Sequence, residues 1–259
     1  MTELSDTAAG PEARPAIAYE GVAFAYGPGA PFIEGLSAAI PAGRITSIVG
    51  PNGCGKSTLV KLAAGLLRPA AGRVVVDGCD TGALSARERA RRLAVLAQSP
   101  RVPPLTVEAL VACGRHPYGG RTGRLGPADR EAVEAALERA GVQRLRRHDL
   151  RRLSGGERQR AYLAMILAQD TDLIVLDEPT TYLDINACHD LMALVRDLNR
   201  REGKTVAMVI HDLDLALRYS DRLVVMERGR VRAQGAVAEV LAADAVGAAF
   251  AMDVCPHER

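Results

Sequence analysis

The chain has 259 residues, a formal net charge of +2 and 48% hydrophobic residues. This length suits one large domain, or two closely joined subdomains, with a buried core. The small net charge gives no support for a nucleic-acid partner. The five cysteines are scattered and form no CxxC pair. We therefore expect neither a disulfide framework nor a zinc site, and we favour a reducing, cytosolic compartment.

The N-terminal segment is polar, and we predict that residues 1–16 form a disordered leader. It contains Pro11 and Pro15 and lacks the basic and apolar regions of a signal peptide. No apolar run in the chain approaches the roughly 20 residues that a membrane-spanning helix needs. The stretch VAFAYG that follows the leader reads as a strand with Phe24 and Tyr26 on one face.

Strands and helices then alternate, which is typical of an α/β fold with a mainly parallel sheet. RITSIV (44–49) reads as a strand, and apolar residues recur after it at helical spacing from Leu59 to Leu66. The next predicted elements are a strand at 73–78, a helix at 84–92 and a strand at 93–98.

Strand patterns are absent from Pro104 to Leu153, which predicts an inserted helical subdomain at about 104–158. Within it, Pro127 begins a helix and Gly141 ends it. The elements predicted after the insertion are a strand at 172–177, a long helix with apolar positions from Cys188 to Leu198, a strand at 204–210 and a hairpin at 222–235 about Arg228-Gly229. We assign 17–245 to the main domain and 246–259 to a C-terminal tail.

The turn GPNGCGKST follows the strand at 44–49 and opens a helix, the context that identifies a phosphate-binding P-loop. Its glycines let backbone N–H groups surround a polyphosphate, Lys56 reaches the β- and γ-phosphates, and Ser57 supplies a magnesium ligand. A plain glycine-rich turn is the alternative, but the complete pattern and both flanks argue against it. The expected nucleotide-binding residues here are Gly50, Pro51, Asn52, Gly53, Cys54, Gly55, Lys56, Ser57 and Thr58.

The apolar strand Leu173 to Leu176 ends in Asp177-Glu178. Ligands of open α/β sheets bind at the carboxyl ends of the strands, so both carboxylates would lie beside the P-loop. Asp177 can then orient Mg²⁺, and Glu178 can accept a proton from the water that attacks the γ-phosphate. Two acids that cap a helix are the alternative.

In LSGGERQR, Ser154 with Glu157 three positions later is a capping box that starts a helix. The same helix start can also hold an anion, because its N–H groups are unpaired and the macrodipole is positive there.

Together these residues resemble the ATPase subunit of an ATP-binding-cassette (ABC) transporter, from about Ile17 to Gly235. The matching motifs are GPNGCGKST for Walker A, Gln98 for the Q-loop, LSGGERQR for the signature, LIVLDE for Walker B, YLD for the D-loop and His211 for the switch histidine. The resemblance implies a P-loop NTPase (RecA-like) core with an antiparallel β-subdomain and an inserted α-helical subdomain.

The resemblance also implies a head-to-tail homodimer that binds ATP and Mg²⁺ in two composite sites. Asp184 of the D-loop would communicate across the interface. Glu178 and His211 would be the catalytic residues, and His211, which follows a buried strand, would touch the γ-phosphate. The signature residues expected to close over the partner's ATP are Ser154, Gly155, Gly156 and Glu157. The expected magnesium ligands are Ser57, Gln98 and Asp177. Alone, His211 would be a structural hydrogen-bonding residue and Gln98 a strand-end amide.

Family members often stack adenine on an aromatic residue near Tyr26. Phe24 is the other candidate, and one of the two could belong to the core. We prefer Tyr26 because it lies at the strand end, before Gly27-Pro28.

Longer stretches resemble importer ATPases for ferric siderophores, haem and cobalamin, particularly the siderophore branch. They are LVACGRHPYGG, DEPTTYLDI and IHDLDLALRYSDRLVVMERGRVRAQG. This implies a peripheral subunit on the cytoplasmic side of the inner membrane, with permease subunits and a substrate-binding protein as partners and no nucleic acid. GRHPY would help to form the groove for the permease's coupling helix, or else be an ordinary Gly/Pro loop. INACHD departs from the His-Gln that relatives often have after the D-loop.

Other classes remain as alternatives: a cobalamin or haem importer ATPase, an exporter cassette, or a soluble non-transport ABC ATPase. Soluble cassettes of translation usually carry two tandem cassettes, whereas this chain has one P-loop and one signature. Chromosome ATPases place a long coiled coil between Q-loop and signature, but residues 98–154 show no sustained heptads. A P-loop kinase would not need LSGGERQR.

Overall fold

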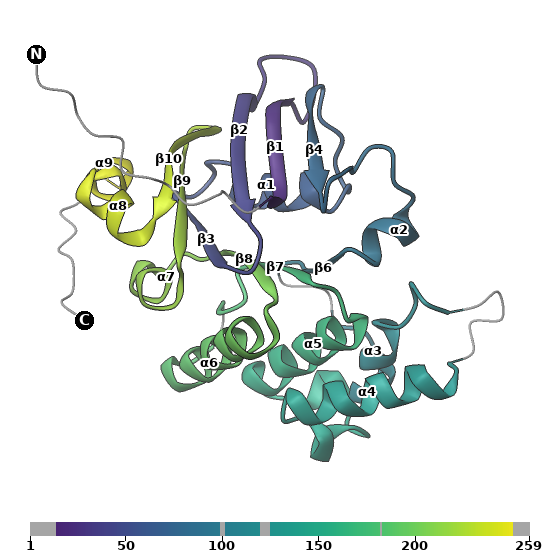
Figure 1. Ribbon diagram of the computed structural model, residues 1–259. Helices are drawn as coiled ribbons and strands as arrows, with labels where there is room; N and C mark the ends of the chain where they lie inside the picture. The colour runs from purple at the N-terminus through teal and green to yellow at the C-terminus, as the bar shows by residue number, and fades with distance from the viewer. Residues whose placement is uncertain (1–13, 99–101, 120–124, 182, 251–259) are drawn as a thin grey trace, which may run out of the picture.

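The computed structural model describes residues 14–98, 102–119, 125–181 and 183–250, and their strands form two sheets. The smaller sheet has the order β2-β1-β4-β5 and is antiparallel throughout. In Figure 1 it lies at one end of the molecule, the helices around α5 lie at the other, and the larger sheet lies between them. The strands of the smaller sheet are β1 (Pro15–Phe24), β2 (Ile33–Pro41), β4 (Ala71–Val76) and β5 (Cys79–Asp80).

The larger sheet has six strands in the order β10-β9-β3-β8-β7-β6, and only β10 runs antiparallel to its neighbour. Every residue of β3, β7 and β8 is buried, as expected for parallel strands that are covered on both faces. The strands are β3 (Ile45–Val49), β6 (Leu93–Leu96), β7 (Leu173–Asp177), β8 (Thr205–Val209), β9 (Arg222–Glu227) and β10 (Arg230–Ala236).

Two hydrophobic cores cover the two faces of the larger sheet. One lies between the sheets and includes α1 (Lys56–Ala63), which contributes Leu59 and Leu62. The other packs the opposite face against α5 (Gly155–Gln169), α6 (Ile185–Glu202) and α7 (Leu213–Tyr219). The helices that bury both faces therefore hold the carboxyl ends of the parallel strands in a fixed arrangement.

The inserted helices α3 (Val107–Cys113) and α4 (Pro127–Arg139) both pack on α5. Pro127 occupies the first turn of α4, where its missing N–H leaves no hydrogen bond unmade, and Gly141 follows the helix with φ +67°. Two short 3₁₀ helices, Gln143–Leu145 and Leu150–Arg152, join α4 to α5. Because α5 runs on to Gln169, the helical block extends beyond the boundary predicted at residue 158.

Other predicted boundaries also differ from the structure. The helix after the P-loop ends at Ala63; Gly65 has φ +65° and Leu66 is 69% exposed, so Leu66 is not on its apolar stripe. The helix predicted at 84–92 is the short α2 (Ala86–Ala90), capped by Ser85. The hairpin turn at Arg228-Gly229 is confirmed, since both residues have positive φ as a tight two-residue turn requires.

The structured part of the chain also extends beyond both ends predicted for the main domain, residues 17 and 245. β1 begins at Pro15, within the range predicted for the leader, and residues 1–13 lie outside the described part. After α8 (Val237–Ala242), α9 (Ala245–Phe250) packs on β9 and β10 through the buried Val246, so the chain remains part of the core beyond residue 245. Residues 251–259 of the predicted tail lie outside the described part. None of the described helices has the length and apolar character that crossing a bilayer requires.

Candidate active site

The P-loop follows the buried strand β3 and leads directly into α1. Gly50 has φ +150°, and a Cβ there would lie 2.2 Å from the carbonyl oxygen of Met226. Only glycine fits at that point. Gly53 also has positive φ (+76°), but a Cβ there would meet nothing within 4 Å, so this side of the loop is open. The loop thus offers a glycine-lined backbone on one side of a turn, as a phosphate cradle requires.

Lys56, the first residue of α1, is buried and turns its ammonium group toward the loop. Its Nζ donates to the carbonyl oxygens of Gly50 at 2.7 Å and Pro51 at 3.0 Å. Cys54 is also buried, and burial raises the pKa of its thiol, which marks it as a packing residue of the loop. A lysine held at the centre of this loop is the arrangement that phosphate binding needs.

Tyr26 lies next to α1 and is 63% exposed. Its hydroxyl forms a hydrogen bond of 2.8 Å with Oγ1 of the buried Thr58. The rings of Phe24 and Phe32 contact it edge-on, with centroids 4.8 and 5.6 Å away. Phe24 is buried in the core. Of the two aromatic candidates, Tyr26 is therefore the one with a ring face accessible beside the P-loop helix.

Ser57 and Asp177 meet where β7 ends beside α1. The Ser57 hydroxyl donates to Oδ1 of Asp177 at 3.1 Å. Asp177 is only 3% exposed, and this burial raises the pKa of its carboxyl group. A hydroxyl and a carboxylate are hard oxygen ligands of the kind that Mg²⁺ prefers. The pair fits a magnesium ion bound next to the P-loop, which would neutralise the buried carboxylate.

Glu178 is the point on which three side chains converge. Its Oε2 accepts hydrogen bonds from Nε2 of Gln98 at 2.6 Å and from Oγ1 of Thr181 at 3.3 Å. Its Oε1 pairs with Nε2 of His211. The Glu178 side chain is 10% exposed, whereas that of His211 is 42% exposed. The backbone of Glu178 has φ +53°, and its N–H donates to the carbonyl of Val209 on β8.

Strand order explains this convergence. β7 lies between β6 and β8, so Gln98, just past β6, and His211, just past β8, flank Glu178, just past β7. Gln98 was predicted as a magnesium ligand with Ser57 and Asp177; its amide nitrogen bonds to Glu178, and the prediction for its amide oxygen stays a prediction. The sequence interpretation missed Thr181; its only signal was a hydroxyl three residues after the acidic pair.

The signature segment forms the capping box that its sequence predicts. The Ser154 hydroxyl donates to Oε2 of Glu157 at 2.8 Å, and the Glu157 N–H donates to the Ser154 hydroxyl oxygen at 3.3 Å. The hydrogen bonds from Ser154 lower the pKa of the Glu157 carboxyl group. Gly155 and Gly156 form the first turn of α5. The Glu157 carboxylate is therefore used within its own helix start.

Asp184 lies beside this helix start. It caps α6 by accepting the N–H of Ala187 at 2.8 Å, and a Cβ on Gly156 would lie 3.4 Å from the Cβ of Ala187. A cleft of about 570 Å³ is lined by Ser154 to Glu157 together with Asp184. The structure describes the whole P-loop, and none of its residues lines this cleft. Tyr182 of the D-loop lies outside the described residues.

The GRHPY segment, Gly114 to Tyr118, directly follows α3 and contacts α2 through hydrogen bonds. Arg87 of α2 and Arg91, the residue directly after α2, both donate to the carbonyl of Pro117, at 2.8 and 2.9 Å. The guanidinium carbon of Arg115 lies 4.1 Å from the centre of the Tyr118 ring, within cation–π range. A Cβ on Gly114 would lie 2.2 Å from the carbonyl oxygen of Met165 in α5. The segment is thus a packed joint with a required glycine.

Comparison with known proteins decides the family. The model of the ABC transporter family matches residues 33–181. The chain belongs to this family. It is an ATP-hydrolysing subunit of an ABC importer, and its P-loop core with an antiparallel β-subdomain and a helical subdomain is the fold that the sequence predicted.

Two curated relatives and one solved structure illustrate the likeness. The ferric enterobactin transport ATP-binding protein FepC of Escherichia coli is 44% identical over 214 residues, 82% of this chain and 79% of that protein. A cobalamin import ATP-binding protein, BtuD of Halobacterium salinarum, is 44% identical over 223 residues, 86% of this chain and 56% of that protein. The dimeric, post-hydrolysis cassette MJ0796 bound to ADP and Pi is 28% identical with TM-score 0.76, and the match covers 85% of this chain and 98% of that one.

Proposed function

We propose that this ABC importer subunit energises uptake of a ferric siderophore across the cytoplasmic membrane. The observation that carries the proposal is the likeness to FepC, a ferric enterobactin transport protein, over most of both chains. The GRHPY joint, whose sequence is typical of the siderophore branch, supports it. The subunit would act from the cytoplasmic side of the inner membrane, bound to permease subunits that receive cargo from a substrate-binding protein.

We assign the chemistry to the residues around the P-loop. Gly50 to Thr58 bind the phosphates of ATP with Lys56 as the main cation, and Tyr26 presents its exposed ring to the adenine. Mg²⁺ would supply charge neutralisation at the phosphates when bound by Ser57 and Asp177, with Gln98 as the third proposed ligand. Because Gln98 donates a hydrogen bond to Glu178, its position is coupled to that of the catalytic carboxylate.

Glu178 is the general base for the attacking water. His211 holds one carboxylate oxygen, and Gln98 and Thr181 hold the other, so the base is oriented by groups from β6, β8 and its own turn. A carboxylate held at both oxygens has a defined position relative to the P-loop. This fixed geometry is the condition for efficient proton transfer from a bound water.

We further propose a head-to-tail homodimer. Ser154, Gly155, Gly156 and Glu157 of one chain would close over ATP on the partner's P-loop, with Asp184 at the same surface. The separate cleft that these residues line supports this, because the signature then needs a second chain to meet a nucleotide. The dimeric state of the MJ0796 cassette is consistent with it.

Mixing two inactive variants tests the dimer. Lys56→Ala removes the P-loop cation but keeps the signature, whereas Gly155→Asp keeps the P-loop and places a negative charge where the partner's phosphates would bind. An acid in the first helical turn favours the helix dipole, so the second variant should fold. Only mixed dimers contain one intact composite site, so the mixture should hydrolyse ATP at up to about a quarter of the wild-type rate. A mixture no more active than the two variants alone contradicts the composite site.

Cargo is tested in cells. A strain that lacks this chain should grow poorly when iron is scarce and should fail to accumulate a labelled ferric siderophore. Wild-type protein should restore uptake and Lys56→Ala should not. The likeness to BtuD makes cobalamin the second candidate. Normal siderophore uptake in the deletion strain, with failure of cobalamin or haem uptake, would show that the cargo assignment is wrong and leave the ATPase assignment intact.

A further inference from the structure

A cleft lined by arginines lies away from the active site, between the ends of α6 and α7, the start of β9 and helix α8. Its volume is about 990 Å³. Asp221 is the one carboxylate among its lining residues in the described part of the chain. The whole chain has 33 basic and 31 acidic residues, so five arginines against one aspartate make a local excess of positive charge in the cleft. The lining arginines are Arg44, Arg196, Arg200, Arg218 and Arg222.

The position of this basic cleft separates it from the nucleotide site. Arg44 immediately precedes β3, whose opposite end leads into Gly50 of the P-loop. Arg222 begins β9, which runs parallel to β3 with Arg222 paired to Thr46. Both arginines therefore lie at the amino-terminal edge of the sheet, whereas the P-loop and Glu178 lie at the carboxyl-terminal edge.

The positive charge of the basic cleft is not neutralised by its own carboxylate. Asp221 accepts from Arg200 at 2.5 Å through Oδ1 and from the N–H of Ile45 at 2.9 Å through Oδ2. Within the described residues, the other four arginines make no ion pair within 4.0 Å. In the described part of the chain these four arginines therefore line one cleft without a carboxylate within 4.0 Å, and a bound anion would supply the missing counter-charge.

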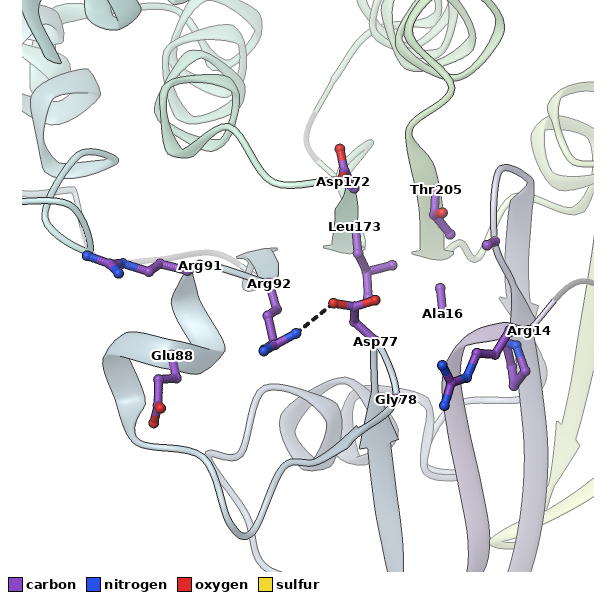
Figure 2. A pocket seen from close by; sticks show the side chains of 12 residues that line it. Arg14, Ala16, Asp77, Gly78, Glu88, Arg91, Arg92, Asp172, Leu173 and Thr205 are labelled. Atoms are coloured by element: carbon purple, nitrogen blue, oxygen red, sulfur yellow. Dashed lines mark hydrogen bonds and ion pairs between the residues drawn. The ribbon is translucent and has the colours of Figure 1, made fainter. Parts of the chain in front are cut away.

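A second cleft of about 570 Å³, shown in Figure 2, makes a useful contrast. There the charges balance, and Arg92 forms an ion pair of 2.7 Å with Asp77. Its charged lining residues are Arg14, Arg91, Arg92, Asp77, Glu88 and Asp172. An unbalanced arginine cluster is therefore not a general property of the clefts on this protein.

Helix ends explain only part of the arginine cluster. Arg200 and Arg218 lie in the last turns of α6 and α7, where cations favour the helix dipole. Arg44 precedes β3, Arg222 is the first residue of β9, and Arg196 lies in the body of α6, so the dipole accounts for none of these three. The guanidinium carbons of Arg196 and Arg218 lie 5.7 and 5.8 Å from the ring centre of the buried Tyr219, which holds both groups at the cleft.

We propose that the basic cleft binds a soluble small molecule that carries two or more phosphate groups. Guanidinium groups bind phosphate oxygens in bidentate fashion, and several of them in one concave site suit a polyphosphate. The volume is at the upper end of the roughly 300–1,000 Å³ of small-molecule sites. Val237 and Leu241 of α8 give the cleft an apolar wall for the remainder of the molecule. A membrane surface would instead match a flat basic face.

Titration calorimetry with tripolyphosphate tests this site. All proteins carry Lys56→Ala, so that the P-loop contributes equally little to binding. The test variant adds Arg196→Gln and Arg222→Gln. The matched control adds Arg201→Gln, because Arg201 is on the same helix, is 79% exposed at its side chain and does not line the cleft. Removal of each charge-assisted hydrogen bond should weaken binding roughly tenfold, and the control should change it less than about twofold.

Equal affinity in the parent, test and control proteins would overturn the proposal, as would no detectable binding to the parent at about 0.15 M salt. Arg222 is half-buried, so Arg44→Gln, at an exposed position, replaces it if the test variant does not fold. A parallel flotation assay uses vesicles that contain phosphatidylglycerol. Vesicle binding that depends on Arg196 and Arg222, without tripolyphosphate binding, would assign the cleft to a lipid headgroup and overturn the soluble ligand.

Discussion

Replacement of Glu178 by glutamine tests the proposed catalytic base with the least disturbance of structure. In the wild-type protein Oε2 accepts from Gln98 and Thr181, and Oε1 pairs with His211. The glutamine oxygen can keep the first two contacts. Its amide nitrogen can donate to Nε2 of His211 when the imidazole proton is on Nδ1. The variant therefore keeps every contact and loses only the proton acceptor.

The expected magnitude follows from this geometry. Loss of a positioned general base lowers the rate of hydrolysis by roughly 10²- to 10⁴-fold, which is about 3–5 kcal/mol of activation free energy. Stability should change by about 1 kcal/mol or less, because each hydrogen bond has a replacement. ATP binding should persist, since Lys56 and Ser57 are untouched, and the variant should therefore accumulate an ATP-bound dimer.

Phosphate release and molecular size measure the two effects. The purified Glu178→Gln protein is compared with wild type and with Glu34→Gln, whose side chain is 66% exposed. Thermal unfolding confirms equal folding, and light scattering with ATP and Mg²⁺ reports the dimer. A folded variant that retains more than about a tenth of the wild-type rate would refute the assignment of Glu178 as the base. A variant that stays monomeric with ATP at high concentration, even with its permease, would refute the composite site.

Three further changes have defined outcomes. Gly50→Ala should destabilise the fold by on the order of 3 kcal/mol, against about 1 kcal/mol for Gly53→Ala, because only the first Cβ meets a carbonyl oxygen, and denaturant unfolding compares them. Burial raises the pKa of Asp177 above 3.8, so its stabilising contribution is complete below pH 3.8 and is lost as pH rises through the folded pKa. Without nucleotide or Mg²⁺, the melting temperature of wild type relative to Asp177→Asn should therefore fall as pH rises, and a constant difference would contradict the buried carboxylate. Tyr26→Ala should weaken ATP binding about three- to tenfold while Tyr26→Phe retains it, and equal affinities would exclude stacking on this ring.

The parts of the site that sequence could predict are those with short-range determinants. The P-loop requires glycine at Gly50 for a local reason, since its φ and its approach to Met226 admit no side chain. The capping box of Ser154 and Glu157 spans one helical turn. The apolar run before Asp177 identifies a buried parallel strand, and the general rule for open sheets then places the carboxylate near the loop. Each of these features is contained within a few residues of one element.

The contacts of Gln98 depended on information that no local pattern carries. Its partner Glu178 is 80 positions away, and His211 is 33 positions beyond Glu178. The three meet only because β7 lies between β6 and β8 in the sheet. The predicted length of the helix after the P-loop was wrong for a different, local reason: apolar spacing continues to Leu66, but Gly65, with positive φ, has already turned the chain out of the helix. The sequence thus supplied the candidate residues, and the order of the strands determined which of them are in contact.

One consequence of that order concerns how the base is controlled. Glu178 is held by Gln98 and His211 through hydrogen bonds that a displacement of about 1 Å would break, because such bonds weaken steeply with distance. Gln98 lies two residues past β6, between the core and the inserted helices in sequence, and GRHPY connects those helices to the region of α2 by hydrogen bonds. We therefore expect that a movement of the helical subdomain that displaces Gln98 would change the position of the Glu178 carboxylate and thereby the rate of hydrolysis.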